Sequence, residues 1–368
     1  MESIKTISTE MLANSLKNGE AITIIDIRPQ HEREEWHIPQ SIHIDVYDQL
    51  KAGDISALDT ISIDAQIPVV ALCAGGNLSK FATELLTKKG FDAYSLEGGM
   101  KAWNYAWDSK EIVFDELKII QVRRVAKGCL SYIIGSGKSA MVIDASLDPK
   151  VYIDLASNEG WTIETVSDTH IHADYVSRTI DLQNITNADH IMHSSALVSY
   201  PFNAIQNEAI IKIGNAIVQL IHTPGHTWES VSFLINNKAL LTGDTLFTDG
   251  IGRPDLKADH EEAIKKASAL YDSLHHLISL GENVQVFPAH ISKPISIGYE
   301  LITASIANLK TSVKSLRLDK EVFIEAVLSK LPASPPNYLT IAGINKEGFL
   351  GEHILADLEA GANRCAIK

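Results

Sequence analysis

Short apolar segments alternate with amphipathic segments along the first hundred residues of the chain. Residues 21–27 (AITIIDI) and 69–73 (VVALC) are apolar runs of the length that forms buried parallel strands. Residues 78–90 (LSKFATELLTKKG) place apolar side chains at helical spacing and end at a glycine, which predicts an amphipathic helix. This alternation predicts an α/β fold for the first part of the chain.

Strand-forming segments follow one another more closely in the second part of the chain. Apolar runs such as CLSYIIG, SAMVIDA, AIVQLIHT and ALLTGD each predict a strand, and helices are expected between them, notably over 261–280 and 296–316. The change follows a tryptophan-rich segment, KAWNYAW, and places a break at 108–111. We therefore expect two domains, over residues 1–108 and 112–368.

The composition is that of a globular protein with an excess of acidic residues. Of the 368 residues, 45% are hydrophobic and 21% are charged, and the formal net charge is −14. This charge argues against nucleic-acid and membrane-surface partners. No apolar run is long enough to span a bilayer, and the N-terminus lacks the apolar core of a signal peptide. Three widely spaced cysteines fit a reducing compartment, so a cytoplasmic location is expected.

Cys73 is the first candidate for chemistry, because it lies between an apolar strand and a predicted helix. It is followed by residues 74–77 (AGGN), and glycines allow successive backbone N–H groups to point inward and bind an anion. The helix N-terminus adds partial positive charge, which would stabilise a thiolate or a bound persulfide. From spacing alone, a sulfur-transfer nucleophile and a buried structural cysteine fit equally well.

Flanking motifs extend this candidate site. They are DIR at 26–28, Glu32, WHIP at 36–39, SIHI at 41–44, LEGG at 96–99 and Trp103. Together they resemble the rhodanese family over about residues 4–107, which implies a rhodanese fold with Cys73 as the sulfur carrier. The family's active loop usually carries arginines where this chain has Ala74 and Leu78. Because dianionic thiosulfate needs such a cation, we expect a persulfide rather than thiosulfate at Cys73.

Histidine and acidic residues close several strand-like segments of the second domain. Loops at such positions present ligands from a rigid scaffold, and imidazole with carboxylate suits zinc, iron(II) or manganese. A single histidine of this kind is more often structural, but the clustering in four segments predicts a metal site. The residues are His170, His172 and Asp174 in HIHAD, His222 and His226 in HTPGHT, Asp244 in TGD, and His290 in PAH.

The order of these segments follows a known pattern. Asp144 in MVIDA, the H-x-H-x-D segment that begins at His170, TPGHT, GD and a late AH resemble the metallo-β-lactamase superfamily over roughly residues 115–300. The resemblance implies an αββα fold, in which two packed sheets are flanked by helices. Its glyoxalase II and persulfide dioxygenase branches are the most similar. GRPD at 252–255 and NRC at 363–365 are similar to segments of persulfide dioxygenases.

Tyr175 stands where the superfamily motif normally ends in a histidine. In the superfamily's second metal position that histidine would act together with Asp174 and His290. The loss of an imidazole there disfavours the two-metal arrangement of the hydrolases. The hydroxyl of Tyr175 is expected to donate to a metal-bound water, to substrate or to Asp174, and an aromatic filler under the loop is the alternative.

The remaining ligand candidates are two histidines and one carboxylate, a set typical of non-haem iron(II) oxygenases. The resemblance to persulfide dioxygenases implies one iron(II) per chain at these positions, with zinc as the alternative metal. They are His170, His226 and Asp244, with His222 held in reserve. The residues expected to hold the ligands and waters in place are His172, Asp174, His290 and Asp144.

The resemblances together imply an enzyme that oxidises a low-molecular-weight thiol persulfide with O2 to sulfite and the free thiol. Glutathione persulfide is the expected substrate, and Cys73, Tyr175 and Arg253 are the expected catalytic side chains. For Arg253, a structural ion pair with Asp255 has equal weight.

Two other functions compete with this one. The first is a zinc-dependent thioester hydrolase of glyoxalase II type, against which Tyr175 counts. The second is a non-catalytic sulfur-binding module, suggested by the altered rhodanese loop. The sequence leaves open the thiol carrier, the direction of sulfur flow between the domains and whether the chain forms a homo-oligomer.

Overall fold

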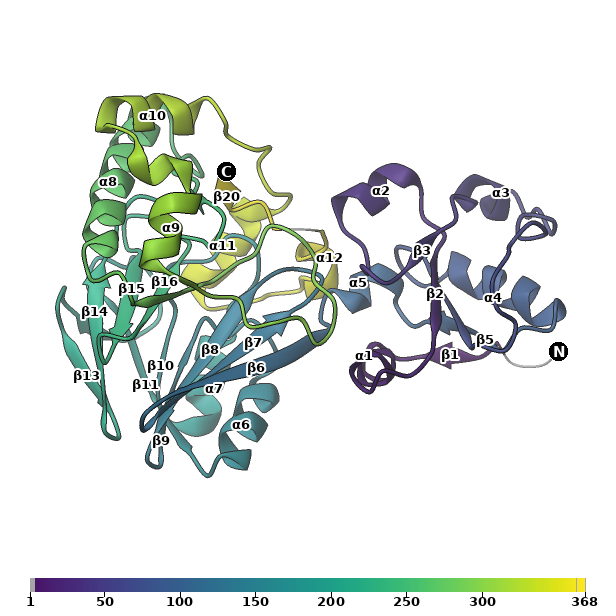
Figure 1. The fold of residues 1–368 in the computed structure, drawn as a ribbon, viewed down its shortest axis with the longest axis horizontal. Helices are drawn as coiled ribbons and strands as arrows, with labels where there is room; N and C mark the ends of the chain where they lie inside the picture. Colours follow the sequence, from purple (N-terminus) through teal and green to yellow (C-terminus); the bar gives the residue numbers. More distant parts are fainter. Residues whose placement is uncertain (1–3, 362, 368) are drawn as a thin grey trace.

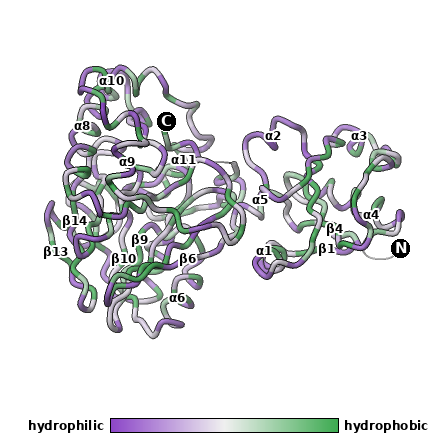
Figure 2. The backbone as a smooth tube through the Cα atoms, viewed as in Figure 1, coloured by the Kyte–Doolittle hydropathy of each residue, from purple (hydrophilic) through white to green (hydrophobic). Residues whose placement is uncertain are grey.

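Two domains lie side by side along the long axis of the molecule (Figure 1). The structure, a computed structural model, describes residues 4–361 and 363–367, so that residues 1–3, 362 and 368 lie outside the described part. Hydrophobic residues are concentrated along the strands of both domains, whereas hydrophilic and hydrophobic residues alternate along the helices (Figure 2). This is the distribution that burial of apolar surface favours.

A five-stranded parallel sheet forms the N-terminal domain. In the order in which they pair, its strands are β1 (Thr6–Ile7), β5 (Ala93–Leu96), β4 (Val69–Leu72), β2 (Thr23–Asp26) and β3 (Ile42–His43). Its helices are α1 (Thr9–Lys17), α2 (Gln30–Glu35), α3 (Tyr47–Lys51), α4 (Leu78–Lys88) and α5 (Gly99–Trp103). The strands expected at 21–27 and 69–73 are β2 and β4, and the helix expected at 78–90 is α4. The predicted α/β fold of this domain is confirmed.

A seven-stranded sheet opens the second domain. In pairing order its strands are β12 (Asn203–Ile205), β11 (Asp189–His193), β10 (Thr162–Ser167), β9 (Ser139–Ile143), β8 (Leu130–Ser136), β7 (Leu117–Arg124) and β6 (Trp107–Phe114). The break expected at 108–111 lies inside β6, whose residues pair in antiparallel register with β7. Asp108 also forms a buried ion pair with Arg123 of β7, so this segment belongs to the second domain.

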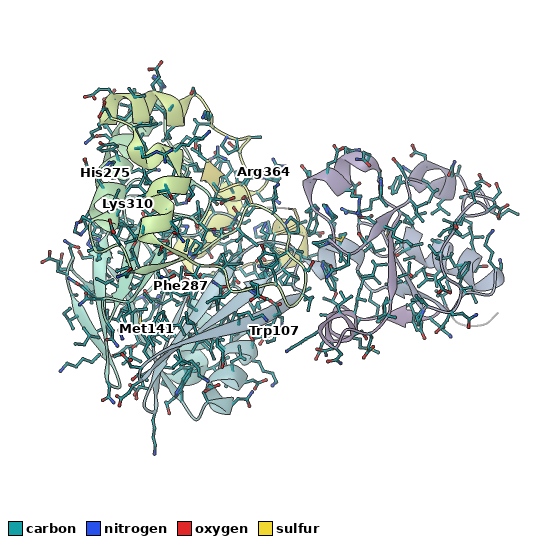
Figure 3. All side chains as sticks on the ribbon, viewed as in Figure 1. Trp107, Met141, His275, Phe287, Lys310 and Arg364 are labelled. Atoms are coloured by element: carbon teal, nitrogen blue, oxygen red, sulfur yellow. The ribbon has the colours of Figure 1, made fainter. Side chains whose placement is uncertain are left out.

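A six-stranded sheet packs against the seven-stranded one. In pairing order its strands are β13 (Ile210–Ile213), β14 (Ala216–His222), β15 (Val231–Ile235), β16 (Ala239–Gly243), β18 (Gln285–Pro288) and β19 (Ala304–Ser305). Apolar side chains from both sheets form one core between them, in which Met141 and Phe287 lie (Figure 3). Because the outer face of each sheet is apolar too, helices must cover both faces.

Helices pack on the outer faces of the two sheets. α6 (Pro149–Asn158) and α7 (Thr179–Thr186) cover the seven-stranded sheet. The other sheet is covered by α8 (His260–Ile278), α9 (Ile306–Ser312), the 3-10 helix η1 (Lys314–Arg317) and α10 (Lys320–Leu328). The predicted αββα fold is confirmed.

The helix expected over 296–316 is wrong in its first half. Residues 296–303 have no helical structure, and α9 begins only at Ile306. The backbone of this segment bonds to side chains of β7 instead. Gln121 binds the N–H and C=O of Ile302, and Arg123 donates to the carbonyl oxygens of Tyr299 and Glu300.

The C-terminal segment returns to the junction between the domains. It contains α11 (Tyr338–Glu347), α12 (Leu355–Leu358) and β20 (Ala366–Ile367), which pairs with β17 (Ile251–Gly252). α12 lies next to α5 of the first domain (Figure 1), and Arg364 forms an ion pair with Glu35 across the junction. Within the described ranges, no helix has the length and apolarity needed to cross a membrane.

Candidate metal centre

The histidines and carboxylates singled out in the sequence meet at one edge of the two packed sheets. His170 lies in the loop after β10, His226 follows β14, Asp244 follows β16 directly, and His290 comes two residues after the end of β18. All four lie at the carboxyl ends of strands, and all are at most 2% exposed. The rigid sheets therefore position the side chains of a single buried cluster.

His170, His226 and Asp244 present one ligand atom each to a common point. The Nε2 atoms of His170 and His226 lie 3.7 and 3.6 Å from Oδ2 of Asp244. His170 Nε2 and Asp244 Oδ2 are buried and have no hydrogen-bond partner among the described residues. Unpartnered buried polar atoms are costly, so their convergence fits a bound cation. Two imidazole nitrogens and one carboxylate suit iron(II) or zinc.

The two histidines are held by hydrogen bonds on their Nδ1 side. Nδ1 of His170 lies 3.0 Å from the hydroxyl of Thr169, and Nδ1 of His226 lies 2.8 Å from the carbonyl oxygen of Arg253. Because the carbonyl can only accept, Nδ1 of His226 carries the proton and Nε2 remains free as a ligand. Such partners orient metal-ligating histidines.

Asp144 anchors the start of the same loop. Its carboxylate accepts hydrogen bonds from the backbone N–H and the hydroxyl of Thr169, at 2.7 and 3.0 Å. It also contacts Nε2 of His172 at 2.9 Å. Nδ1 of His172 is buried and has no partner among the described residues, and the centroid of its ring lies 4.1 Å from that of His170. Asp144 and His172 therefore lie next to the ligand candidate His170, and their supporting role stays a prediction.

Burial and neighbouring charges set the protonation of the ligands. Burial lowers the pKa of His170 well below its ordinary value, and repulsion from His172 lowers it further. Burial raises the pKa of Asp244, but the imidazoles of His290 and His170 outweigh it and hold that pKa below the usual range. A neutral imidazole and an ionised carboxylate are the forms that bind a metal.

Tyr175 occupies a different place from the one expected. Its ring stacks on His172 at 4.3 Å between centroids, and its hydroxyl lies 2.8 Å from His172 Nε2 and donates to the carbonyl oxygen of Asp144 at 3.2 Å. No hydrogen bond joins it to Asp174 among the described residues. Burial raises the pKa of Tyr175 well above its ordinary value, so that the phenol stays neutral. It supports His172 and is not an aromatic filler alone.

Asp174 and His290 lie together beside the three ligands. His290 contacts Asp174 Oδ2 through Nε2 at 2.9 Å and Asp244 Oδ1 through Nδ1 at 2.5 Å. Burial lowers the pKa of His290, but the two carboxylates on either side raise it well above its ordinary value. His290 thus connects the second position to the carboxylate of the first.

Three residues of this second position were missed by sequence reasoning. Cys129 donates to Asp174 Oδ2 at 3.5 Å, Asn363 donates to the same oxygen at 2.8 Å, and Cys365 lies within ligand range of Asp244 and His290. From the sequence, Cys129 and Cys365 are used only as an indication of a reducing compartment. The only signal was the NRC segment of the tail, and nothing in the local sequence pointed to Cys129.

Two candidates lie outside the ligand cluster. His222 stacks on His193 at 4.0 Å, its Nε2 lies 2.8 Å from the carbonyl oxygen of Trp228, and none of the described potential ligand groups includes it. The guanidinium of Arg253 pairs with Asp255 and donates its other N–H groups to three backbone carbonyl oxygens. Every N–H group of the Arg253 guanidinium donates to another group of the protein. Arg253 therefore has the structural role that was the alternative to catalysis.

Cys73 lies at the end of β4, buried at 3% exposure. Its Sγ accepts hydrogen bonds from the N–H groups of Gly76 and Ser79, at 3.2 and 3.4 Å. Two backbone N–H groups therefore point at the sulfur, and anion binding by this loop stays a prediction.

A cavity of about 190 Å³ lies beside His226, one of the three ligand candidates. His226 lines it together with Trp228, Tyr338 and three lysines, Lys257, Lys266 and Lys346. None of these lysines is within ion-pair distance of a carboxylate in the described part of the chain. Burial, with repulsion from Lys346, lowers the pKa of Lys257. An anion bound here would be stabilised by these cations.

Two packed sheets flanked by helices, with histidines and a carboxylate gathered at their strand ends, define a metal-binding αββα protein. The comparison with family models agrees with this class. Residues 124–320, more than half of the chain, match the metallo-beta-lactamase superfamily, and residues 8–106 match the rhodanese-like domain. The chain therefore belongs to the metallo-beta-lactamase superfamily and carries an N-terminal rhodanese-like domain.

Individual relatives cover the second domain. A hydroxyacylglutathione hydrolase of Rhodopseudomonas palustris is 30% identical over 38% of this chain, and the match spans 54% of that relative. A metallo-beta-lactamase structure from Staphylococcus aureus is 27% identical, with a TM-score of 0.55, over 67% of this chain and 74% of its own. The ETHE1 structure from Myxococcus xanthus is 24% identical, with a TM-score of 0.53. The match covers 65% of this chain and 98% of the ETHE1 chain. At that identity the last comparison shows the fold alone.

Proposed function

We propose that the chain is a non-haem iron persulfide dioxygenase that oxidises a low-molecular-weight thiol persulfide to sulfite. One observation carries the proposal: Tyr175 replaces the histidine of the second metal position, whereas the set of two histidines and one carboxylate is complete. Such a set leaves open positions for a sulfur ligand and O2. The overall reaction converts persulfide, O2 and water into thiol, sulfite and two protons.

His170, His226 and Asp244 would hold the iron, and iron would supply the redox chemistry between persulfide and O2. The protein residues orient this set through Thr169 and the backbone of Arg253. The burial of all three ligands restricts bulk water, so that reactive sulfur species are not exposed to solvent.

The lysine-lined cavity supports an anionic thiol carrier. Lys257 and Lys346 can pair with carboxylates, while Glu229 and Glu262 on the same cavity can pair with an ammonium group. Glutathione carries two carboxylates and one ammonium, and its sulfur would enter on the side of His226. We therefore propose glutathione persulfide as the substrate.

The rhodanese-like domain would handle the same sulfur. The N–H groups of Gly76 and Ser79 point at Cys73 Sγ and would stabilise a thiolate or a persulfide on it. The loop has Ala74 and Leu78 in place of arginines, which favours a persulfide over dianionic thiosulfate. Sulfurtransfer at Cys73 is part of the proposal.

A zinc-dependent thioester hydrolase of glyoxalase II type is the second candidate. The observation in its favour is the similarity to hydroxyacylglutathione hydrolases. In that case the histidines and carboxylates of the cluster would hold zinc, which would supply the Lewis-acid chemistry for hydrolysis of a glutathione thioester.

The two functions are separated by one set of measurements on the full chain prepared anaerobically. Bound iron and zinc are determined first. Oxygen uptake and sulfite formation are then followed with glutathione persulfide, and thiol release is followed with a glutathione thioester. We expect iron, oxygen uptake and sulfite. Thioester hydrolysis with zinc and without oxygen uptake would instead establish the hydrolase.

A further inference from the structure

A buried lysine lies in the wall of the cavity beside His226. Lys266 lines this cavity together with His226 and is only 5% exposed, although a lysine is rarely buried in a protein unless it is paired. Among the described residues its ammonium forms no ion pair, and it donates to the carbonyl oxygen of Leu256 at 3.2 Å. Burial of a charge without a counter-charge is costly, so a function is expected for this lysine.

Helix α8 turns Lys266 toward the loop that carries His226. Lys266 and Leu270 are four residues apart and therefore lie on the same face of the helix. On this face the helix packs directly on the loop, because a Cβ atom at Gly225 would lie 2.5 Å from Cα of Leu270. The position of Lys266 relative to the ligand candidate His226 is thus fixed by close packing of two backbone segments.

The three lysines of the cavity lie at different depths. Lys257 is exposed, Lys346 is partly buried and Lys266 is buried. We propose that Lys266 binds the sulfur anion that reacts at the metal centre, namely the ionised terminal sulfur of the persulfide before the reaction and the sulfite ion after it. Lys257 and Lys346 remain available for the carboxylates of the thiol carrier. The identity of the anion rests on the proposed function, whereas the capacity of Lys266 to bind an anion does not.

Donors of Lys266 remain for such an anion. An ammonium has three N–H groups, and among the described residues only the carbonyl oxygen of Leu256 accepts from one of them. Hydrogen bonds between an ammonium and an anion are stronger than those between neutral groups. A sulfur anion in the cavity would therefore both use these donors and neutralise the buried charge.

The carboxylates on the same cavity are engaged elsewhere. Glu229 accepts from the backbone N–H of Ile171 at 3.1 Å. Glu262 accepts from the indole N–H of Trp228, also at 3.1 Å. Burial lowers the pKa of Lys266, and the charges of Glu229 and Glu262 oppose this effect from beyond ion-pair distance. An anion in contact with the ammonium would favour its charged form further.

Sulfite binding tests the role of Lys266 on the full chain as isolated. Anaerobic isothermal titration calorimetry gives the dissociation constant of sulfite for the wild type and for Lys266→Met, which removes the charge but keeps a long side chain. We expect the variant to bind sulfite about 10- to 100-fold more weakly, because a hydrogen bond from a charged group is lost. Lys265→Met is the matched control on the same helix, since Lys265 pairs with Glu261 at the surface, and it should bind sulfite as the wild type does. Equal affinity in Lys266→Met and the wild type, or no sulfite binding by the wild type, would overturn the proposal.

S-Methylglutathione distinguishes the reacting sulfur from the carrier, because it has the carboxylates and the ammonium of glutathione but no persulfide. Its affinity should be the same in Lys266→Met and the wild type. A loss as large as that for sulfite would assign Lys266 to the carrier and refute the proposal. Oxygen uptake by the wild type with glutathione persulfide tests the proposed function separately. If that uptake is absent, the sulfite titration still decides whether Lys266 binds the anion.

Stability separates a binding role from a structural one. Lys266→Met removes a buried charge, so its free energy of unfolding in urea should equal or exceed that of the wild type. A lower free energy of unfolding together with unchanged sulfite affinity would show that Lys266 has only a structural role. If circular dichroism shows that Lys266→Met does not fold, Lys266→Gln decides, because its amide can still donate to Leu256. Wild-type sulfite affinity in Lys266→Gln would then contradict the proposal.

Discussion

The carboxylate of Asp144 contacts several groups of the loop that contains Thr169, His170 and His172. It accepts from the N–H and hydroxyl of Thr169 and contacts His172, while Thr169 in turn contacts His170. The sequence identified Asp144 and His172 as supporting residues through the family resemblance alone. That Thr169 connects them to His170 follows only from the folded loop, because a hydroxyl next to a histidine has no distinctive pattern in sequence.

Substitution of His226 tests the assignment of the ligands. His226→Ala removes one of three metal-binding side chains and should lower iron content and persulfide-dependent oxygen uptake by more than about 100-fold, beyond the loss expected from changing a supporting residue. The rhodanese-like domain should stay folded. His222→Ala is the control, since His222 contacts His193 and Trp228 instead. Full oxygen uptake in His226→Ala would show that the site is misassigned.

Removal of the Tyr175 hydroxyl tests its support of His172. Tyr175→Phe keeps the stacked ring but leaves His172 Nε2 with Asp144 as its remaining partner. We expect unchanged iron content, lower turnover and a loss of about 1–3 kcal/mol in the free energy of unfolding. Elemental analysis, kinetics and urea denaturation measure the three effects. Wild-type turnover together with wild-type stability would mean that the ring alone matters.

Restoring a histidine at the same residue tests why the second position differs from that of the hydrolases. Tyr175→His adds an imidazole beside Asp174 and His290 and should tighten zinc binding there, because nitrogen is a far better zinc ligand than a phenol. Competition with a metal indicator gives the dissociation constants of the variant and the wild type. Equal zinc affinity would contradict the idea that Tyr175 disfavours the two-metal arrangement.

At the scale of elements, the end of β16 lies very close to the loop that contains Thr169 and His170. Gly243 has a φ of +53°, and a Cβ atom there would lie 2.6 Å from the hydroxyl oxygen of Thr169. The strand pattern predicted β16 and the position of Asp244 after it. It did not predict that this glycine allows the strand and the loop to meet, because the contact joins segments that are far apart in sequence.

Gly243→Ala should therefore lower the free energy of unfolding more than an alanine at a comparable turn does. Gly137→Ala is the matched control, since its φ is +61° and nothing lies within 4 Å of the added carbon. The control should lose about 1–2 kcal/mol of stability from backbone strain. Gly243→Ala should lose more and bind less iron, because Thr169 is displaced. Urea denaturation and metal analysis compare them, and equal losses would exclude a role for the close approach.

At the scale of the whole molecule, a buried ion pair connects the C-terminal segment to the domain junction. Arg124 and Glu359 are fully buried and 2.7 Å apart, and Arg124 also donates to the carbonyl oxygen of Asn104. Glu359 accepts in addition from the N–H of Val176, next to Tyr175. The segment thus joins the first domain, the second domain and the metal-binding loop.

Breaking this pair should destabilise the entire chain. Glu359→Gln leaves Arg124 buried without its counter-charge and should cost about 3–5 kcal/mol. Asp357→Asn is the control two residues away, because Asp357 pairs with Lys101 at the exposed surface and should cost at most about 1 kcal/mol. Denaturant unfolding measures both. Similar small losses in the two variants would show that the buried pair contributes little.

The sequence by itself determined both fold classes, the order of the strands that carry ligands, and the candidate ligands His170, His226 and Asp244. Hydrophobic periodicity was enough for the α/β fold of the first domain. The αββα fold and the candidate ligands of the second domain came from motifs that resemble the metallo-β-lactamase superfamily. Only the tertiary structure decided that β6 crosses the expected break, that Arg253 is fully occupied, and that Cys129 lies beside Asp174 and His290. These depend on contacts between distant segments, which a local pattern of residue types does not encode.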